Sequence, residues 1–177
     1  MVDKVVFVAG VHGTGKTTLC GRLKADLDVY HYSASALIKT QRGLTKNLAK
    51  IAKDVAANNE ALVDAVNALP DSKILMDGHF SLFTKNHNIF LVPEITFEKI
   101  NISIIILLTC DPHDIVARLK GRDSYIHPIK EFKALQDAEE AHANHVAKLI
   151  NVPIIKINTS KPIDYESTLN QINKEFI

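Results

Sequence analysis

The sequence predicts an α/β fold in which a parallel sheet is covered by helices on both faces. Three observations predict it. Apolar, β-prone runs lie at residues 5–9, 73–80, 102–109 and 152–157, and continuous runs of this kind are typical of strands buried on both faces. Segments with helical periodicity separate these runs, and such alternation favours a parallel sheet. A glycine-rich loop joins the first run to the first helical segment.

Length and composition predict a single domain over residues 1–177, because the chain is too short for two domains of typical size. The formal net charge of +1 predicts no global field that would attract nucleic acid or a membrane. Cys20 and Cys110 follow neither metal nor secretory spacing and indicate a reducing compartment. The longest apolar stretch, 102–108, is too short to span a bilayer, and the start of the chain lacks a signal-peptide pattern. We therefore expect a cytoplasmic protein.

The glycine-rich loop carries the strongest chemical signal. Residues 10–18 read GVHGTGKTT and match G-x-x-x-x-G-K-[ST], the phosphate-binding P-loop. Glycine allows the backbone to adopt positive φ around an anion, Lys16 reaches the β- and γ-phosphates, and the Thr17 hydroxyl is placed to ligate Mg²⁺. The residues expected to bind the nucleotide here are Gly10, His12, Gly13, Thr14, Gly15, Lys16, Thr17 and Thr18. The motif predicts binding of a nucleoside triphosphate with Mg²⁺.

The segment that follows predicts helices around one short strand. The expected elements are a helix from residue 17, a strand over 28–32, a helix over 33–42, and one helix over 46–69 or two helices broken near 58–59. The first helix places Leu19 and Leu23 four residues apart on one face. Gly43 is the residue type favoured just past a helix end, and Pro70 stops the last helix.

The second half continues the alternation. The expected elements are a strand over 73–80, an irregular segment over 81–92, a short helix over 93–100, a strand over 102–109, a helix from 112, a long helix through 132–149, a strand over 152–157 and a helix from about 164. Pro112 is well tolerated at the first helical position. Pro153 cannot donate to a sheet ladder, so the last strand is expected at an edge.

Two residues near the end of the third expected strand, Asp77 and His79, are candidates for chemistry. Asp77 closes an apolar run, at the end of the strand where open α/β sheets bind their ligands. It is expected to hold Mg²⁺ together with Thr17; the alternative is an aspartate that caps the next turn. His79 either orients a water or an acceptor hydroxyl or is a turn histidine.

A metal site on the long helix is not expected. Glu139, His142 and His145 follow one another at intervals of three, which permits metal ligation in principle. However, the apolar stripe through His142 favours packing.

With these residues in place, the chain resembles the nucleoside monophosphate kinase group of P-loop kinases, most closely the short archaeal-type adenylate kinases and their bacterial relatives. The resemblance rests on the P-loop, on Asp77-Gly78-His79, and on a segment over 107–122 in which Asp-Pro begins a helix carrying Arg118 and Arg122. It implies a three-layer α/β/α P-loop NTPase fold with a five-stranded parallel sheet in the order 2-3-1-4-5 and a small lid at about residues 118–130.

The resemblance also implies roles for basic residues. Arg118 is expected to stack on the adenine or to contact phosphate, and Arg122 to reach the transferred group, where lid arginines stabilise charge. The alternative is a solvated helix end that favours cations. Lys39 and Arg42 lie where the acceptor-binding helices of the group are found, and Arg42 is suited to bind a phosphate in a bidentate manner. Lys161 follows the last strand, where this fold usually holds the base.

The predicted function is a phosphotransferase that moves the γ-phosphate of Mg-ATP to a nucleotide or other small acceptor, with Lys16, Asp77, Arg118 and Arg122 as catalytic residues. Two alternatives stay open. One is a polynucleotide 5′-end kinase, although the charge balance does not indicate a basic channel. The other is an ATP-dependent switch without an acceptor, which the absence of a familiar monophosphate-binding signature between the P-loop and Asp77 favours.

Overall fold

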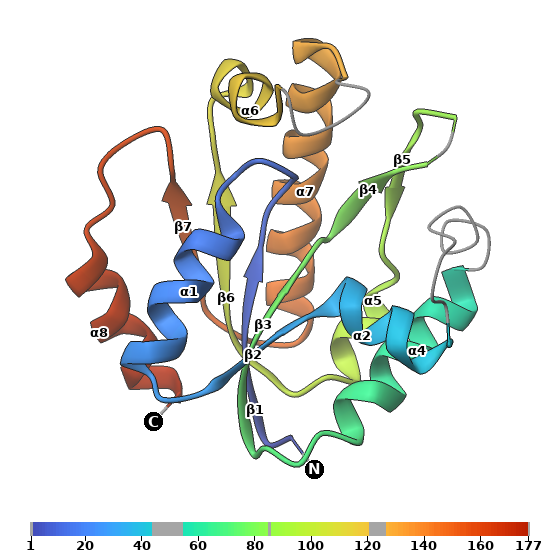
Figure 1. Cartoon of the computed structure of the whole chain (residues 1–177), viewed down its shortest axis with the longest axis vertical. Helices are drawn as coiled ribbons and strands as arrows, with labels where there is room; N and C mark the ends of the chain where they lie inside the picture. The colour runs from blue at the N-terminus through green and yellow to red at the C-terminus, as the bar shows by residue number, and fades with distance from the viewer. Residues whose placement is uncertain (1, 44–54, 85, 121–126, 177) are drawn as a thin grey trace.

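A five-stranded parallel sheet forms the centre of the computed structural model, which describes residues 2–43, 55–84, 86–120 and 127–176 (Figure 1). Its strands are β1 (Lys4–Ala9), β2 (Tyr30–Ser33), β3 (Lys73–Gly78), β6 (Ile102–Thr109) and β7 (Ile154–Asn158). They lie in the order β2-β3-β1-β6-β7. Counted along the chain through these five strands, that order is 2-3-1-4-5, as the resemblance implies, and β7 is at an edge as its proline predicts.

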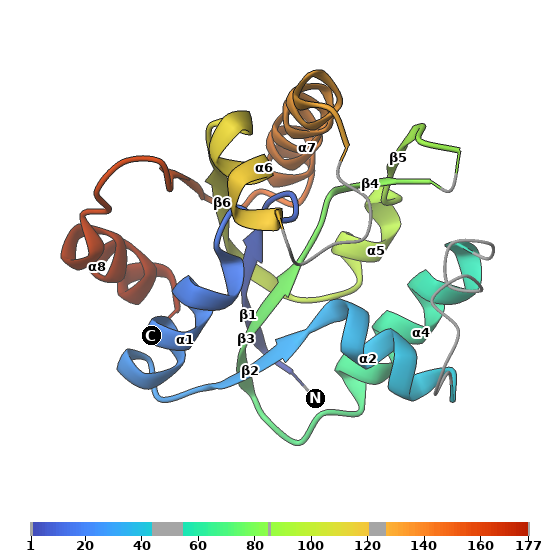
Figure 2. The same ribbon diagram turned by 45° about the horizontal axis from the view of Figure 1, so that its top comes forward.

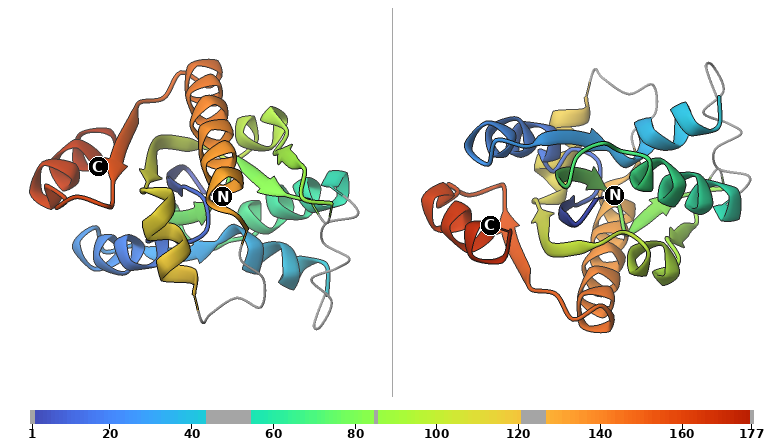
Figure 3. Two further views of the ribbon diagram at one scale, coloured as in Figure 1. Left: turned by 90° about the horizontal axis from the view of Figure 1, so that it is seen from above. Right: turned by 90° about the horizontal axis from the view of Figure 1, so that it is seen from below.

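Helices cover both faces of the sheet (Figures 2 and 3). The helices are α1 (Lys16–Asp26), α2 (Ala34–Gln41), α4 (Val55–Asn67), α5 (Glu94–Glu98), α6 (Pro112–Leu119), α7 (Ile129–Leu149) and α8 (Tyr165–Phe176). α1 and α8 pack on one face; α4, α5 and α7 pack on the other. The predicted three-layer α/β/α fold is therefore confirmed.

The residues from Val5 to Ala9 of β1 are apolar without interruption because both faces of this strand are buried. Val6 and Val8 are fully buried in the cluster that α1 and α8 share, whereas Phe7 and Ala9 are buried in the cluster beneath α7. Because alternate side chains point to opposite faces, a central parallel strand requires apolar residues at every position. This packing fixes the carboxyl end of β1, where the glycine-rich loop begins.

Two expectations about the elements were wrong. Within the segment expected to be irregular, β4 (Ser81–Phe83) and β5 (Ile89–Leu91) pair as an antiparallel hairpin. Strands of three residues with partly exposed side chains leave no period-two pattern long enough to recognise. α4 runs without a break through residues 58–59, so the version with two helices broken there is also wrong. The expected helical residues 46–54 lie outside the described residues.

The remaining boundaries follow the predictions closely. α6 begins at Pro112, and its N-cap Asp111 accepts a hydrogen bond from the backbone N–H of His113 at 2.8 Å. In the described part of the chain, none of the helices has the length and apolar character needed to cross a membrane.

Candidate functional site

The P-loop connects β1 to α1 and depends on its glycines. Gly10, Gly13 and Gly15 have φ values of +147°, +85° and +94°, in a region of backbone conformation that residues other than glycine rarely adopt. A Cβ on Gly10 would lie 2.7 Å from the backbone oxygen of Leu108, so the loop also needs glycine there for its close approach to β6. The loop leads directly into the N-terminus of α1, where backbone N–H groups and the helix dipole favour a phosphate. The backbone therefore fits a nucleotide.

A cavity of about 680 Å³, the first cavity, opens over this loop. Its lining consists of residues 12–19 with Arg22, Ser35, Asp77, His79, Arg118, Leu119, Thr159, Ile163 and Tyr165. The fold thus brings most of the predicted nucleotide-binding residues together. Lys161 is exposed and is not part of this lining, which its neighbours Thr159 and Ile163 supply instead.

Lys16 is held inside the loop. Its Nζ donates hydrogen bonds to the backbone oxygens of Gly10 at 2.5 Å and Val11 at 3.2 Å. Burial lowers the pKa of Lys16 from 10.5 to about 8, and the nearby carboxylates of Glu139 and Asp77 act in the opposite direction. The ammonium is therefore poised to gain from an anion bound in the first cavity.

Glu139, which the sequence presented only as a possible metal ligand, lies against the P-loop in the structure. Its carboxylate is buried on α7 and accepts hydrogen bonds from the backbone N–H of Gly10 at 3.1 Å, from that of Phe80 at 2.9 Å, and from the N–H and hydroxyl of Ser81 at 2.5 and 2.7 Å. Burial raises the pKa of Glu139, whereas the hydrogen bonds from Phe80 and Ser81 and the charge of Lys16 lower it. This carboxylate joins the P-loop, the segment after β3 and α7.

Of the two histidines near Glu139, His142 is buried, in keeping with the apolar stripe that runs through it, whereas His145 lies on the surface. The Nε2 of His142 lies 2.7 Å from the backbone oxygen of Val92, and its ring packs edge-on against Phe80. His145 pairs with Glu94 on the surface, Nε2 to Oε1, at 2.9 Å. Each histidine is thus paired with a group other than Glu139.

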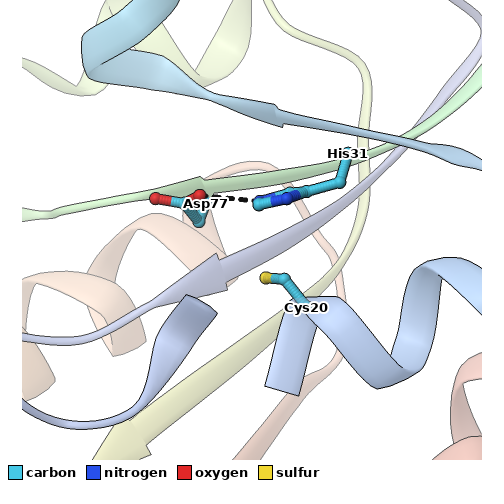
Figure 4. A group of neighbouring side chains, drawn as sticks. All are labelled: Cys20, His31 and Asp77. Atoms are coloured by element: carbon cyan, nitrogen blue, oxygen red, sulfur yellow. Dashed lines mark hydrogen bonds and ion pairs between the residues drawn. The ribbon is translucent and has the colours of Figure 1, made fainter. Parts of the chain in front are cut away.

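Asp77 is the penultimate residue of β3 and lines the first cavity together with the P-loop. Its Oδ2 lies 2.7 Å from the Nε2 of His31 on β2, and the Sγ of Cys20 on α1 points toward the same pair (Figure 4). Burial raises the pKa of the Cys20 thiol to about 12, so it stays protonated at neutral pH. His31 holds the aspartate at the edge of the first cavity, which Thr17 also lines. A hydroxyl and a carboxylate are oxygen ligands of the type that Mg²⁺ prefers.

A second cavity of about 430 Å³ adjoins the first. It lies among α2, α4 and the β4–β5 hairpin, and its wall is mostly apolar. The apolar lining includes Phe7, Ile38, Leu62, Leu82, Phe83, Phe90, Val92 and Phe97. Lys39, Asn58 and Asn59 add polar groups. Of the three predicted acceptor residues, Lys39 and His79 line this cavity, whereas Arg42 donates to the side-chain oxygen of Asn58 and so supports the wall.

The two cavities share His12, Ser35, Asp77 and His79 in their linings. The Nδ1 of His79 is buried, with no hydrogen-bond partner among the described residues, and its ring lies edge-on to that of His12 at 4.7 Å between centroids. Burial, followed by the charge of Lys16, holds the pKa of His79 well below 6.5. At the junction the structure therefore places a neutral imidazole that a ligand could engage.

Arg118 lies across the rim of the first cavity. Its guanidinium donates to the backbone oxygen of Gly13 at 3.1 Å, and to the hydroxyl and backbone oxygen of Thr159 at 3.2 and 3.0 Å. It therefore bridges the P-loop and the segment after β7. Arg122 and residues 121–126 of the expected lid lie outside the described residues.

Arg22 and Tyr165 also line the first cavity, although neither belongs to a sequence motif. The guanidinium of Arg22 stacks on the ring of Tyr165, 3.6 Å from its centroid. A pairing across 143 positions has no local sequence signal, because it depends on α8 lying beside α1.

The strand–loop–helix geometry and the lysine within it define a P-loop nucleotide-binding domain. The chain belongs to the AAA_17 family, described as an AAA domain, whose model matches residues 9–133.

Individual relatives are distant in sequence. The chain is 28% identical over 174 residues to UMP-CMP kinase 2 from Oryza sativa subsp. japonica, covering 89% of this chain but only 64% of that protein. It is 26% identical over 153 residues to an adenylate kinase from Methanoculleus marisnigri, covering 79% of this chain and 80% of that protein.

Solved structures confirm the fold. A deoxyadenosine kinase from M. mycoides superposes with a TM-score of 0.61 at 15% identity, covering 97% of this chain and 98% of that one. A shikimate kinase from Bacteroides thetaiotaomicron superposes with a TM-score of 0.58 at 15% identity, covering 97% and 96%.

Proposed function

We propose that this protein is a phosphotransferase that moves the γ-phosphate of Mg-ATP to a nucleotide or other small acceptor. The observation that carries the proposal is the meeting of the two cavities at Asp77 and His79. One cavity has a P-loop and the other has an apolar wall, so a donor and an acceptor have separate places with one shared boundary. The distant likeness to a UMP-CMP kinase and an adenylate kinase supports the same reading.

In this proposal the first cavity holds the donor. The loop N–H groups and Lys16 bind the β- and γ-phosphates, and Arg118 anchors the nucleotide side of the cavity. Thr17 and Asp77 hold Mg²⁺, which when bound neutralises charge on the phosphates. Arg122, which lies outside the described residues, keeps the role that the resemblance implies, a contact with the transferred group. Positioning and electrostatics supply the catalysis, so the mechanism needs no covalent intermediate on the protein.

The second cavity holds the acceptor. Its aromatic and aliphatic wall suits a flat, mostly apolar body such as a nucleobase, while Lys39 and the two asparagines can bind polar groups. The neutral imidazole of His79 accepts a hydrogen bond from the acceptor or orients it toward the donor. Arg42 acts through Asn58, or reaches an acceptor phosphate directly if that pairing opens.

Both alternatives are weaker. The comparisons give no support for a polynucleotide acceptor. An ATP-dependent switch needs the first cavity but gives no reason for the second. We also propose a cytoplasmic location, in keeping with two buried cysteines that form no disulfide.

The test is phosphate transfer from γ-labelled ATP and Mg²⁺ to a panel of nucleoside monophosphates, nucleosides and a short 5′-hydroxyl oligonucleotide. The proposal predicts labelling of one small acceptor, lost in Asp77→Asn. Labelling of the oligonucleotide alone would support the end kinase instead. Slow release of labelled phosphate with every acceptor unlabelled would support the switch.

A further inference from the structure

Three side chains outside both cavities converge at the tip of the β4–β5 hairpin. The Nδ1 atoms of His87 and His127 lie 3.4 Å apart, and the Oε2 of Glu131 lies 2.7 Å from the same nitrogen of His127. All three atoms lie within 4.8 Å of one another. His87 belongs to the hairpin turn, whereas His127 and Glu131 belong to the entry and first turn of α7. None of the three lines the first or the second cavity.

The spacing of these atoms fits a shared metal ion. With Zn–N bonds of 2.0–2.1 Å and tetrahedral angles, two imidazole ligands of one Zn²⁺ lie about 3.4 Å apart. The two Nδ1 atoms already lie at that distance. The carboxylate oxygen is somewhat nearer to His127 than a co-ligand would be, and a small rotation of the exposed Glu131 side chain corrects this.

Surrounding contacts hold the three residues in place. The backbone N–H of His87 donates to the oxygen of Thr84 at 3.0 Å. The ring of His127 stacks on Phe83 of β4 with centroids 3.9 Å apart. Glu131 is positioned by α7, its N–H donating to the oxygen of Pro128 at 2.9 Å. Each ligand is thus anchored by its own backbone or by packing, which limits the ordering that a metal would have to impose.

We propose that His87, His127 and Glu131 form a Zn²⁺ site that ties the β4–β5 hairpin to the start of α7. Two imidazoles and one carboxylate suit Zn²⁺ and leave a fourth position for water, whereas Mg²⁺ and Ca²⁺ prefer oxygen ligands throughout. The hairpin contributes Leu82, Phe83 and Phe90 to the wall of the second cavity. A metal at its tip therefore fixes one wall of that cavity against the longest helix.

Calorimetric titration of the untagged, nucleotide-free protein with ZnCl₂ tests the proposal. We expect one site in the wild type, and His87→Ala and Glu131→Gln should each weaken binding at least about tenfold, since each removes one of three ligands. His145→Ala is the matched control, because it removes a surface histidine that also pairs with a glutamate. Its affinity should equal that of the wild type. Zn²⁺ should also raise the melting temperature of the wild type and of this control, but not that of His87→Ala.

Specific results would overturn the assignment. Equal Zn²⁺ affinity in His87→Ala and the wild type would do so, as would a wild-type protein that binds no Zn²⁺. A loss of binding in Cys20→Ser, with His87→Ala unaffected, would move the metal to the Cys20, His31 and Asp77 group and also overturn it. These measurements use neither ATP nor an acceptor, so their outcome is independent of the proposed phosphotransferase activity.

Discussion

At the scale of single residues, the burial of Lys16 predicts how kcat/KM for Mg-ATP depends on pH, because burial changes the protonation of this side chain. Its pKa is about 8 because it is buried, so in the free protein the ammonium is charged below pH 8 and loses its proton above it. The value of kcat/KM for Mg-ATP reports groups of the free enzyme. We therefore expect a flat profile up to about pH 8 and a fall of roughly tenfold per pH unit beyond it. Lys39→Met, which changes a lysine of the second cavity, should keep this alkaline fall.

Removal of the Lys16 charge should abolish function. Lys16→Ala should lower kcat/KM for Mg-ATP at least about 100-fold, since the ammonium is the charged side chain inside the P-loop. Steady-state kinetics and ATP binding by calorimetry measure this. Unchanged turnover would show that the loop is not the phosphate site.

Glu139 gives a prediction about stability. Glu139→Gln removes the charge and places an amide among backbone donors, so the free energy of unfolding should fall by about 1–3 kcal/mol. The KM for ATP should rise, because Gly10 loses its partner. The neighbouring Glu140→Gln breaks only an exposed pair with Lys156 and should cost less than about 1 kcal/mol. Equal denaturation midpoints for the two variants would contradict the role given to Glu139.

The sequence could predict that Lys16, Thr17 and Asp77 lie together, as they do in the lining of the first cavity, because each belongs to a local pattern. It could not predict the contacts of Glu139, whose partners lie 58 to 129 positions away and are set by the packing of α7 on the sheet. Arg22 and Tyr165 were missed for the same reason. Residues whose partners are set by tertiary packing carry no signal in their own neighbourhood.

At the scale of elements, alanine substitutions at two glycines distinguish the effect of backbone strain from the effect of helix propensity. Gly15 has positive φ and open space around it, whereas Gly21 lies inside α1 with equally open space. Gly21→Ala should stabilise the protein by about 0.5–1 kcal/mol, since alanine is the better helix former. Gly15→Ala should destabilise the loop and weaken ATP binding. Denaturant midpoints and ATP titrations measure both, and weakened ATP binding in Gly21→Ala as well would contradict the distinction.

The elements whose bounds were predicted best are those with a long pattern. β6 with eight residues and α7 with 21 matched their predictions because each carries several repeats of its period. β4 and β5 could not be predicted, since each has three residues and is stabilised by its partner and by α7. This hairpin matters, because it encloses the second cavity.

At the scale of the whole molecule, a substitution that changes only the second cavity should affect binding of the acceptor and not binding of ATP. Lys39→Met changes a cation of the second cavity that lies outside the first. We expect the KM for the acceptor to rise about tenfold, as for one lost charged contact, with the affinity for ATP unchanged. Calorimetry and steady-state kinetics would separate the two effects. An equal loss of ATP affinity would contradict the division of roles.

The most direct test of the central claim is the initial-velocity pattern when ATP and the labelled acceptor are varied together. Because donor and acceptor occupy adjoining cavities at the same time, transfer should pass through a ternary complex and give intersecting double-reciprocal lines. Parallel lines would mean that the phosphate first transfers to the protein, and ATP consumption independent of acceptor would mean that the second cavity takes no part. Either result would contradict the two-cavity account.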